Sequence, residues 1–525
     1  MIKKPAMKKN LSLQQDDEKM LGCTLDDIIT QLPHRLSDGV QRWIDTTPSK
    51  MAVVCGEQRV SYGQLGVLIK ECKEFLSQNS VRAGDRVLLV CENGLSTLGF
   101  FLAASELNVI VIVGNARLSE REINLVQTDS DPRLVIYTTS DSTDAQQHAI
   151  YASARNVSLS FSELMVSDVF EVEPEIVHED PVDQTLAMIY TTGTTGAPKG
   201  VMLTHRNLTF IAFVSGRLRG IRPGDGVYCV LPMSHVFGLS AVCASVLFSG
   251  GCVFLDSRFD AKQVLATLAN EPIVGFLGVP TMYAMLLEAL SPDWRAASLR
   301  FMYSGGSPME PDLKRRVQDA FGLNLHNGYG LTESGPTICQ TRQSNPLQNT
   351  SVGYCLPGVE LKVVDRLGKA VPQGEVGELV AKGPNIMKGY FRRPELTAEV
   401  LIDGWFHTGD LVFQDESGAV NIAGRSKELI IRSGFNVYPP EVEAVLTLHP
   451  QVSLCAVVGQ SRDGNEDIVA FVQPVAGETL DHQTLLDLAR QNLSGYKVPN
   501  RIIEMETLPA ASSGKILKHQ LKQSL

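Results

Sequence analysis

Short apolar runs alternate with longer amphipathic segments over the first part of the chain. Residues 86–90 and 109–113 have the pattern of buried strands, and residues 98–107 between them have the pattern of a helix. The same alternation recurs in residues 261–268, expected to be helical, and 273–277, expected to form a strand. Apolar strands separated by helices are typical of parallel sheets that are covered on both faces. This part is therefore predicted to be layered α/β.

From about residue 353 the pattern changes to short strand-like runs, such as 360–364, with glycine and proline between them. This change predicts a β-rich subdomain. After Gly424, two apolar runs and the amphipathic stretch 484–493 predict a small α+β unit.

The chain has 525 residues. Because a single hydrophobic core rarely serves more than about 300 residues, at least two domains are expected. We predict an N-terminal domain over residues 1–424, a hinge over 425–428 and a small C-terminal domain over 429–525. The predicted fold class is α/β, and the N-terminal domain is expected to contain two α/β layered subdomains plus the β-rich subdomain.

Composition excludes several classes of protein. The net charge is -11 and the chain lacks the basic face of a nucleic-acid-binding protein. Its ten cysteines form no CxxC pair and no zinc-like set, so a reducing, cytoplasmic location is predicted. Residues 231–255 carry no Asp, Glu, Lys or Arg. Since Pro232, His235 and the pair Gly250-Gly251 interrupt this run, we predict a loop, a buried helix and a buried strand, with no transmembrane span.

The strongest local signal is a loop of glycine and threonine that follows a strand expected at residues 187–190. Its hydroxyls, its backbone N–H groups and one lysine are the donors that a polyphosphate requires. The loop is not a P-loop, because Pro198 stands where that motif needs glycine. The candidate phosphate-binding residues are Thr191, Thr192, Gly193, Thr194, Thr195, Gly196 and Lys199.

Residues 190–204 resemble the signature loop of the adenylate-forming superfamily, which includes acyl- and aryl-CoA synthetases. Further motifs follow in the order of that superfamily, so the resemblance covers most of the chain. They lie at Ser304–Pro308, Asn327–Glu333, Gly404–Asp410, Gly424–Ile430 and Ser513–Lys518.

The resemblance implies an ATP site made from these motifs. Tyr329, between two glycines, would lay its ring against adenine. Asp410 would accept hydrogen bonds from both ribose hydroxyls, and Arg425 would reach the ribose or a phosphate. The other expected nucleotide-binding residues are Gly306, Ser307, Pro308, Asn327, Gly330 and Thr332.

The resemblance also implies the chemistry. Glu333 is a hard oxygen ligand suited to Mg²⁺, with Thr192 as a second expected ligand. Thr332 would donate to a phosphate oxygen. Lys515 is the expected catalytic lysine, because its charge could bridge the attacking carboxylate and the α-phosphate. The acyl-adenylate that forms would then react with the thiol of coenzyme A.

One small domain is expected to serve both half-reactions. The resemblance implies that this domain is mobile and that its hinge residue is Lys427. After adenylation Lys515 would leave, and a loop containing Ser433, Gly434 and Phe435 would line the tunnel for the pantetheine arm.

Residues 231–239 resemble the acid-pocket motif of CoA ligases. His235, a candidate catalytic residue, and Phe237 would therefore lie near the carboxylate. Without an acidic partner in this region, the ammonium of an amino acid would be costly to bury. The remaining expected pocket residues are Gly278, Gly328 and Gly335. The predicted function is an ATP-dependent carboxylate–CoA ligase that acts on a medium- or long-chain fatty acid.

Alternatives stay open. The chain could be an aryl-acid CoA ligase, although Ile431 stands where plant-type aromatic ligases tend to have lysine. It could load a separate carrier protein as an acyl-AMP ligase. A non-catalytic binding descendant is disfavoured, because every expected nucleotide and catalytic position holds a suitable residue type. Peripheral membrane contact also stays open.

Overall fold

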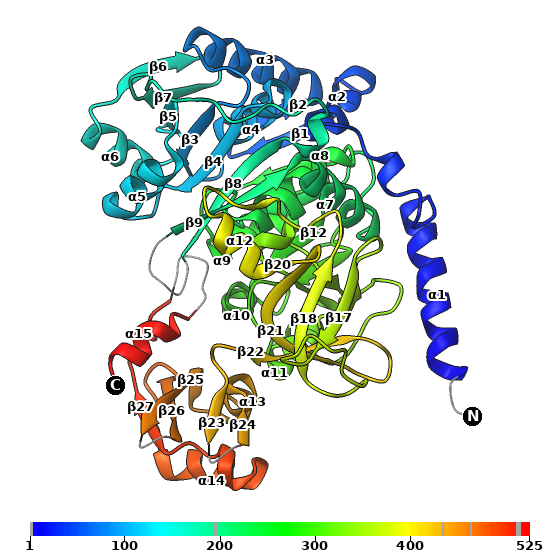
Figure 1. The fold of residues 1–525 in the computed structure, drawn as a ribbon, viewed down its shortest axis with the longest axis vertical. Coiled ribbons are helices and arrows are strands. Elements are labelled where there is room, and N and C mark those ends of the chain that lie inside the picture. The colour runs from blue at the N-terminus through cyan, green and yellow to red at the C-terminus, as the bar shows by residue number, and fades with distance from the viewer. Residues whose placement is uncertain (1–3, 193–197, 433–434, 463–464, 511–515) are drawn as a thin grey trace.

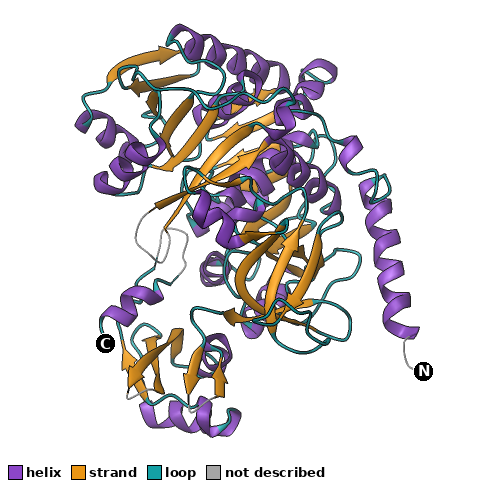
Figure 2. Ribbon diagram, in the orientation of Figure 1, coloured by secondary structure: helices purple, strands orange, loops and turns teal. Residues whose placement is uncertain are grey.

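The computed structural model describes residues 4–192, 198–432, 435–462, 465–510 and 516–525 (Figure 1). Two large sheets and a smaller one carry most of the chain, and the segment after residue 425 forms a separate group of strands and helices at the opposite end from α3 and β6 (Figures 1 and 2).

The first large sheet has nine strands in the order β16-β15-β14-β13-β12-β10-β11-β1-β2. The pairs from β14 through to β1 are parallel, and the strands at the two edges are antiparallel. The strands are β1 (Met51–Cys55), β2 (Gln58–Ser61), β10 (Gly226–Cys229), β11 (Cys252–Leu255), β12 (Ile273–Gly278), β13 (Phe301–Ser304), β14 (Leu325–Tyr329), β15 (Cys339–Gln340) and β16 (Tyr354–Cys355).

The second large sheet has eight strands in the order β19-β9-β8-β4-β3-β5-β7-β6. Its centre is parallel, whereas β8 and β9 form an antiparallel hairpin. The strands are β3 (Arg86–Cys91), β4 (Ile110–Asn115), β5 (Leu134–Tyr137), β6 (Arg155–Leu159), β7 (Ser162–Val166), β8 (Thr185–Thr192), β9 (Pro198–Thr204) and β19 (Gly389–Tyr390).

The predicted β-rich subdomain is a five-stranded antiparallel sheet. Its strands are β17 (Glu360–Val364), β18 (Gly377–Lys382), β20 (Leu401–Ile402), β21 (Trp405–Gln414) and β22 (Val420–Arg425). Beyond it lie a two-stranded and a three-stranded sheet. Their strands are β23 (Ile430–Arg432), β24 (Phe435–Val437), β25 (Val452–Arg462), β26 (Asn465–Pro474) and β27 (Arg501–Glu504).

Helices cover both faces of the large sheets and both faces of the last sheet, with α13 and α14 on one side of it and α15 on the other (Figure 2). Short 3₁₀ turns lie at η1 (Ile29–Gln31), η2 (Pro181–Asp183), η4 (Thr332–Ser334) and η5 (Gly495–Lys497). The α-helices are α1 (Lys4–Leu21), α2 (Leu36–Thr46), α3 (Tyr62–Gln78), α4 (Leu95–Leu107), α5 (Glu120–Ser130), α6 (Thr143–Tyr151), α7 (His205–Leu218), α8 (Ser245–Phe248), α9 (Ala261–Asn270), α10 (Pro280–Ala289), α11 (Pro311–Phe321), α12 (Pro394–Val400), α13 (Pro439–Leu446), α14 (His482–Asn492) and α15 (Lys518–Gln523).

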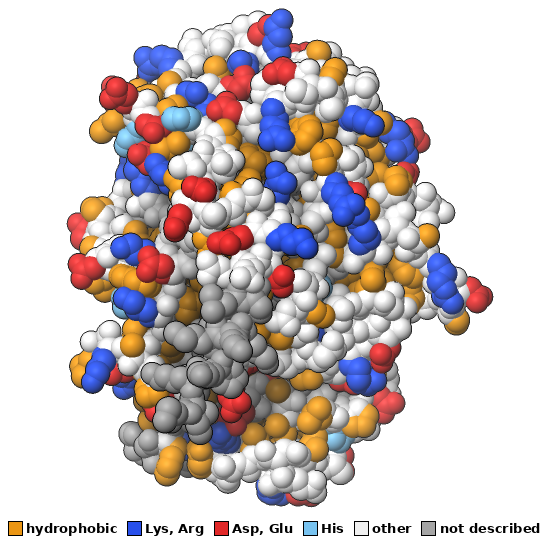
Figure 3. Space-filling model, turned by 90° about the vertical axis from the view of Figure 1, so that its right-hand side faces the viewer, with side chains coloured by type: hydrophobic (Ala, Val, Ile, Leu, Met, Phe, Trp, Pro, Cys, Tyr) orange, Lys and Arg blue, Asp and Glu red, His pale blue; other side chains and the backbone are white. Residues whose placement is uncertain are grey.

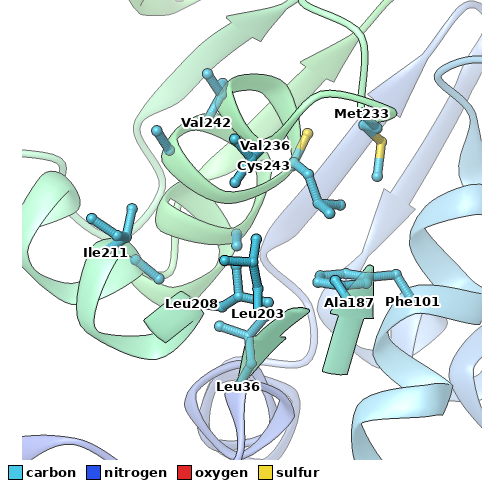
Figure 4. Packing of buried hydrophobic residues seen from close by; sticks show 14 of the residues in the cluster. Leu36, Phe101, Ala187, Leu203, Leu208, Ile211, Met233, Val236, Val242 and Cys243 are labelled. Carbon is cyan, nitrogen blue, oxygen red and sulfur yellow. The ribbon is translucent and has the colours of Figure 1, made fainter. Parts of the chain in front are cut away.

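The apolar run 231–255 is the centre of the core. It forms a loop, a helix and strand β11, as predicted, but the first part of the helix, η3 (Phe237–Ala244), is a π-helix. Hydrophobic periodicity does not separate a π turn from an α turn over eight residues. Helix η3 packs against α7 and α8, in a cluster that also includes buried residues of α2, α4 and β8 (Figure 4). Among the helices that the structure describes, none combines the length and apolar character that crossing a bilayer requires.

Helix α1 is attached to the body through a buried ion pair. Arg342 and Asp17 are only 2% and 6% exposed. The Arg342 Nε and Nη2 atoms lie 2.7 and 3.1 Å from the two carboxylate oxygens of Asp17. Other guanidinium N–H groups donate to the carbonyls of Gln340 and Cys355, each at 2.7 Å. The two partners satisfy each other, so removing either would leave a buried charge.

Charged side chains of both signs are mixed on the surface in Figure 3. Such mixing is consistent with a chain whose binding sites use a few placed cations rather than a broad basic face.

Candidate active site

The Gly-Thr loop connects the two strands of the β8–β9 hairpin. Thr191 pairs with Lys199 across this hairpin. The side chain of Thr192 and residues 193–197 lie outside the described residues. The ammonium of Lys199 lies 5.2 Å from the ring centroid of Tyr390, which belongs to the neighbouring strand β19. The hairpin therefore positions a lysine at the base of the predicted phosphate loop.

Tyr390 also holds Glu333, the predicted Mg²⁺ ligand. Its hydroxyl donates to Glu333 Oε1 at 2.8 Å. Burial, and then the charge of Glu333, raise the pKa of the Tyr390 phenol, so it stays a neutral donor. Glu333 and Thr332 both belong to η4, which follows β14. Sequence reasoning missed Tyr390; a glycine precedes it, as one precedes Tyr329, and this was the available signal.

The predicted ribose ligand, Asp410, lies between two other predicted site residues. It is 4% exposed. Tyr329 donates its hydroxyl to Asp410 Oδ2 at 2.6 Å, and Arg425 Nε lies 2.9 Å from Oδ1. Asp410 and Arg425 meet because their strands, β21 and β22, pair at these residues. Burial first, and then the charge of Asp410, raise the pKa of Tyr329, so its hydroxyl also remains protonated.

The side-chain amide of Asn327 has an oxygen that is available to an adenine base. Asn327 Oδ1 is buried and has no hydrogen-bond partner among the described residues, whereas Nδ2 donates to the carbonyls of Thr350 and Ser351. A buried amide oxygen without a donor is costly, and the exocyclic amino group of adenine would satisfy it. Asn327 pairs with Ser304 at the end of β13, next to the glycine strip. The strip continues through Gly306, Ser307 and Pro308, which are exposed or half-buried.

Two glycines of the Tyr329 motif have different surroundings. A methyl group at Gly330 would lie 1.7 Å from the carbonyl oxygen of Pro336, which no side chain tolerates. The nearest atom to a methyl group at Gly328 would be the carbonyl oxygen of Cys339, at 3.8 Å, an ordinary contact. Gly330 is therefore required by packing, whereas Gly328 is not.

We expect Gly330→Ala to lower the free energy of unfolding by about 1–3 kcal/mol, because the added methyl must displace backbone. Gly328→Ala, the matched control, should leave thermal stability nearly unchanged. Differential scanning calorimetry of the two variants checks this. Equal destabilisation would show that the contact between Gly330 and Pro336 does not decide the effect.

The predicted acid-binding residues lie at the start of η3. Phe237 packs on the glycine strip, since a methyl group at Gly305 would lie 3.2 Å from its ring and 3.3 Å from the carbonyl oxygen of Gly328. His235 is half-buried, and burial lowers its pKa, so the imidazole is neutral at neutral pH. The structure thus brings Phe237, Gly305 and Gly328 together.

The other two predicted pocket glycines have different neighbours. The atoms closest to a methyl group at Gly278 belong to Phe276 and Tyr283. Gly335 adopts φ +70°, and its nearest neighbours are Asn385 and Ile211.

The predicted hinge, residues 425–428, begins at the last residue of β22. Lys427 is exposed, and the next residue, Glu428, forms an ion pair with Lys518 at 3.2 Å. Lys518 also lies 2.7 Å from Glu443 in α13. Ser433, Gly434 and Lys515 lie outside the described residues.

Two further contacts involve the segment after the hinge. The ring of Phe435, a predicted tunnel residue, is 54% exposed and stacks on Tyr496 with 4.7 Å between centroids. Thr447 donates to Glu310 Oε2 at 3.2 Å, which connects α13 to the residue before α11. Burial raises the pKa of Glu310.

Comparison with known proteins gives a consistent picture. The profile of the AMP-binding enzyme family matches residues 40–391, and that of the AMP-binding enzyme C-terminal domain matches residues 441–515. The chain is 35% identical over 484 residues to feruloyl-CoA synthase of Amycolatopsis sp, covering 91% of this chain and 96% of the relative. It is 33% identical over 480 residues to 2-succinylbenzoate–CoA ligase of Bacillus cereus, with coverage of 91% and 96%.

A solved structure is also similar. The crystal structure of ATP-bound MatB from Rhodopseudomonas palustris superimposes with a TM-score of 0.83 at 29% identity, covering 93% of this chain and 98% of that one. The fold and the two family matches define an adenylate-forming enzyme. The chain belongs to the AMP-binding enzyme family. It is an AMP-forming acid–thiol ligase that uses ATP, Mg²⁺ and coenzyme A to make an acyl-CoA through an acyl-adenylate.

Proposed function

We propose that the chain is a CoA ligase for an aromatic carboxylic acid. The observation that carries this proposal is the Phe237 ring, which lies against Gly305 beside Gly328 and gives the expected acid-binding face an aromatic surface. The names of the two curated relatives, feruloyl-CoA synthase and 2-succinylbenzoate–CoA ligase, support it, because both acids contain an aromatic ring.

A fatty acid is the second candidate, because residues 433–439 resemble the corresponding loop of bacterial fatty acyl-CoA synthetases. Ile431, where plant-type aromatic ligases tend to have lysine, is 44% exposed on β23. Its position after the hinge weakens it as an argument about the proposed acid-binding face, which we assign to η3 and the residues that follow β13.

In the first half-reaction, a carboxylate oxygen of the acid attacks the α-phosphorus of ATP and pyrophosphate leaves. Asp410 would hold the ribose, Asn327 the adenine, and Glu333, oriented by Tyr390, the Mg²⁺ ion. That ion neutralises phosphate charge when bound. We propose that the neutral His235 lies against the acid and that Lys515 stabilises charge on the transferred group.

In the second half-reaction, the thiol of coenzyme A releases its proton to solvent and its sulfur attacks the acyl carbon. The bond between the acyl carbon and the phosphate oxygen breaks, and AMP leaves. We propose that residues 429–525 rotate on the hinge 425–428 between the two steps, with Lys427 taking up the backbone rotation. The Thr447–Glu310 contact would break in this rotation. The Lys518–Glu428 pair can persist, since both residues lie beyond Arg425.

The test is pyrophosphate release by the purified chain with ATP and Mg²⁺, across aromatic, aliphatic and amino acids, each with and without coenzyme A. We expect turnover with aromatic acids that rises sharply with coenzyme A. A preference for aliphatic acids would contradict the proposal that the substrate is an aromatic acid. Acyl-AMP that accumulates without any response to coenzyme A would point to a carrier protein.

Because all ten cysteines are free, we also propose a cytoplasmic location.

A further inference from the structure

A fully buried arginine lies behind the proposed acid-binding face. Arg219 follows α7 directly and is 3% exposed. It donates from Nη1 to the carbonyl oxygen of Ala241 in η3. Its Nε atom is buried and has no hydrogen-bond partner among the described residues. Burial lowers the pKa of Arg219 to about 10, and the group that opposes this effect is the Tyr303 hydroxyl rather than a carboxylate. A buried cation without an anionic partner is costly.

The position of this arginine follows from two elements. Tyr303 belongs to β13, and Gly305 is the residue that directly follows the end of that strand. Phe237 and Ala241 are about one turn apart in the π-helix. Phe237 packs at Gly305, while Arg219 contacts Ala241 and lies 5.3 Å from the Tyr303 ring centroid. Arg219 therefore belongs to the next layer inward from Phe237 and Gly305.

The surroundings hold Arg219 and Tyr303 firmly. Gln343 donates to the carbonyl oxygen of Arg219 at 3.0 Å. The Tyr303 ring stacks on His326, with 4.8 Å between centroids and 26° between planes. Tyr303 also donates to the carbonyl oxygen of Thr341 at 3.4 Å. A donor held by packing on several sides is the kind of group that discriminates between ligands.

We propose that Arg219 forms the inner end of the acid pocket and selects acids that carry an oxygen acceptor at the end remote from the reacting carboxylate. The inference rests on the proposed function in taking the Phe237 face as the acid site. A phenol, a phenolate or a second carboxylate would supply the acceptor that Arg219 Nε lacks. An acid that ends in hydrocarbon would bury against the guanidinium and leave that N–H unsatisfied.

The test compares acids that differ only at the far end. The panel is cinnamic acid with a 4-hydroxy, 4-carboxy or 4-methyl group, and octanedioic acid against nonanoic acid as an aliphatic pair. The measurement is kcat/KM for acid-dependent, coenzyme A-dependent pyrophosphate release. We expect the oxygen-bearing members to exceed their hydrocarbon partners by about tenfold or more. The 4-hydroxy and 4-carboxy arms separate a neutral acceptor from an anionic one.

Variants then assign the preference to the side chain. Arg219→Met should reduce the ratio of kcat/KM between oxygen-bearing and hydrocarbon acids to near unity. Arg219→Lys should keep part of this preference for the 4-carboxy acid. Arg217→Met is the matched control, because Arg217 is exposed on the same helix and lies over Phe213. It should leave the ratio unchanged.

Several outcomes would overturn the inference. Equal kcat/KM for oxygen-bearing and hydrocarbon acids in the unmodified chain would do so, whether or not Arg219→Met folds. A loss of activity in Arg219→Met that is equal for all acids would assign Arg219 a purely structural role. Turnover of the aliphatic pair alone would remove the aromatic proposal, yet the ratio within that pair would still decide the role of Arg219.

Discussion

Replacing Lys515 with alanine is expected to lower acid-dependent pyrophosphate release by about 10²–10³-fold, the usual cost of removing one group that stabilises charge in a transition state. Thioester formation from supplied acyl-AMP should be far less affected, because the proposed rotation removes Lys515 from the site before the thiol attacks. The two half-reactions are measured separately, by pyrophosphate release and by consumption of synthetic acyl-AMP with coenzyme A.

A matched lysine is available as a control. Lys522 lies on α15 and is exposed, so Lys522→Ala should leave both rates unchanged. Lys518 is unsuitable because it pairs with Glu428 and Glu443, and its removal would leave two carboxylates without their partner. If Lys515→Ala slowed both half-reactions equally, the division of labour proposed for the C-terminal domain would be wrong.

Replacing Asp410 with asparagine is expected to lower kcat/KM for ATP by about 10²-fold or more, since hydrogen bonds to a charged group contribute roughly 1.5–3 kcal/mol each. The shape of the side chain is kept, but its charge is lost. Arg425, 2.9 Å away, would then lack its anionic partner. The effect should appear mainly in the KM for ATP if the ribose is bound equally in the ground state and the transition state.

The ribose assignment has its own check. The unmodified chain should discriminate strongly between ATP and 2′,3′-dideoxy-ATP, and Asp410→Asn should lose most of that discrimination. Asp403→Asn, an exposed change in the turn before β21, is the charge-matched control. Discrimination that survives in Asp410→Asn would assign ribose binding to another residue.

The sequence predicted the layers of the fold well where the pattern was strong. The strand-like run 360–364 is β17 residue for residue, and 273–277 lies within β12. The glycine-flanked Tyr329 and the distant Asp410 were both predicted for the nucleotide site, and the structure joins them by a hydrogen bond. Motifs of this kind are visible because their residue types and order are themselves the signal.

The remaining features depend on contacts between distant segments. Tyr390 reaches Glu333 across 57 positions, and no local pattern encodes that contact. Arg219 resembles any basic residue at the end of a helix until its burial is known. The π-helix of η3 was predicted only as a helix, because an apolar run carries no information on which carbonyl each N–H will choose.

The ion pair between Asp17 and Arg342 joins a segment outside the matched family region, residues 40–391, to a strand edge inside it. Asp17 and Arg342 are therefore expected to change together in evolution. In a descendant that lost the N-terminal helix, Arg342 would first have to be replaced by an uncharged residue. If the helix were lost first, the guanidinium of Arg342 would be left without its carboxylate partner, which is destabilising. The same order applies to anyone who trims the gene for expression: removing α1 calls for a compensating substitution at Arg342.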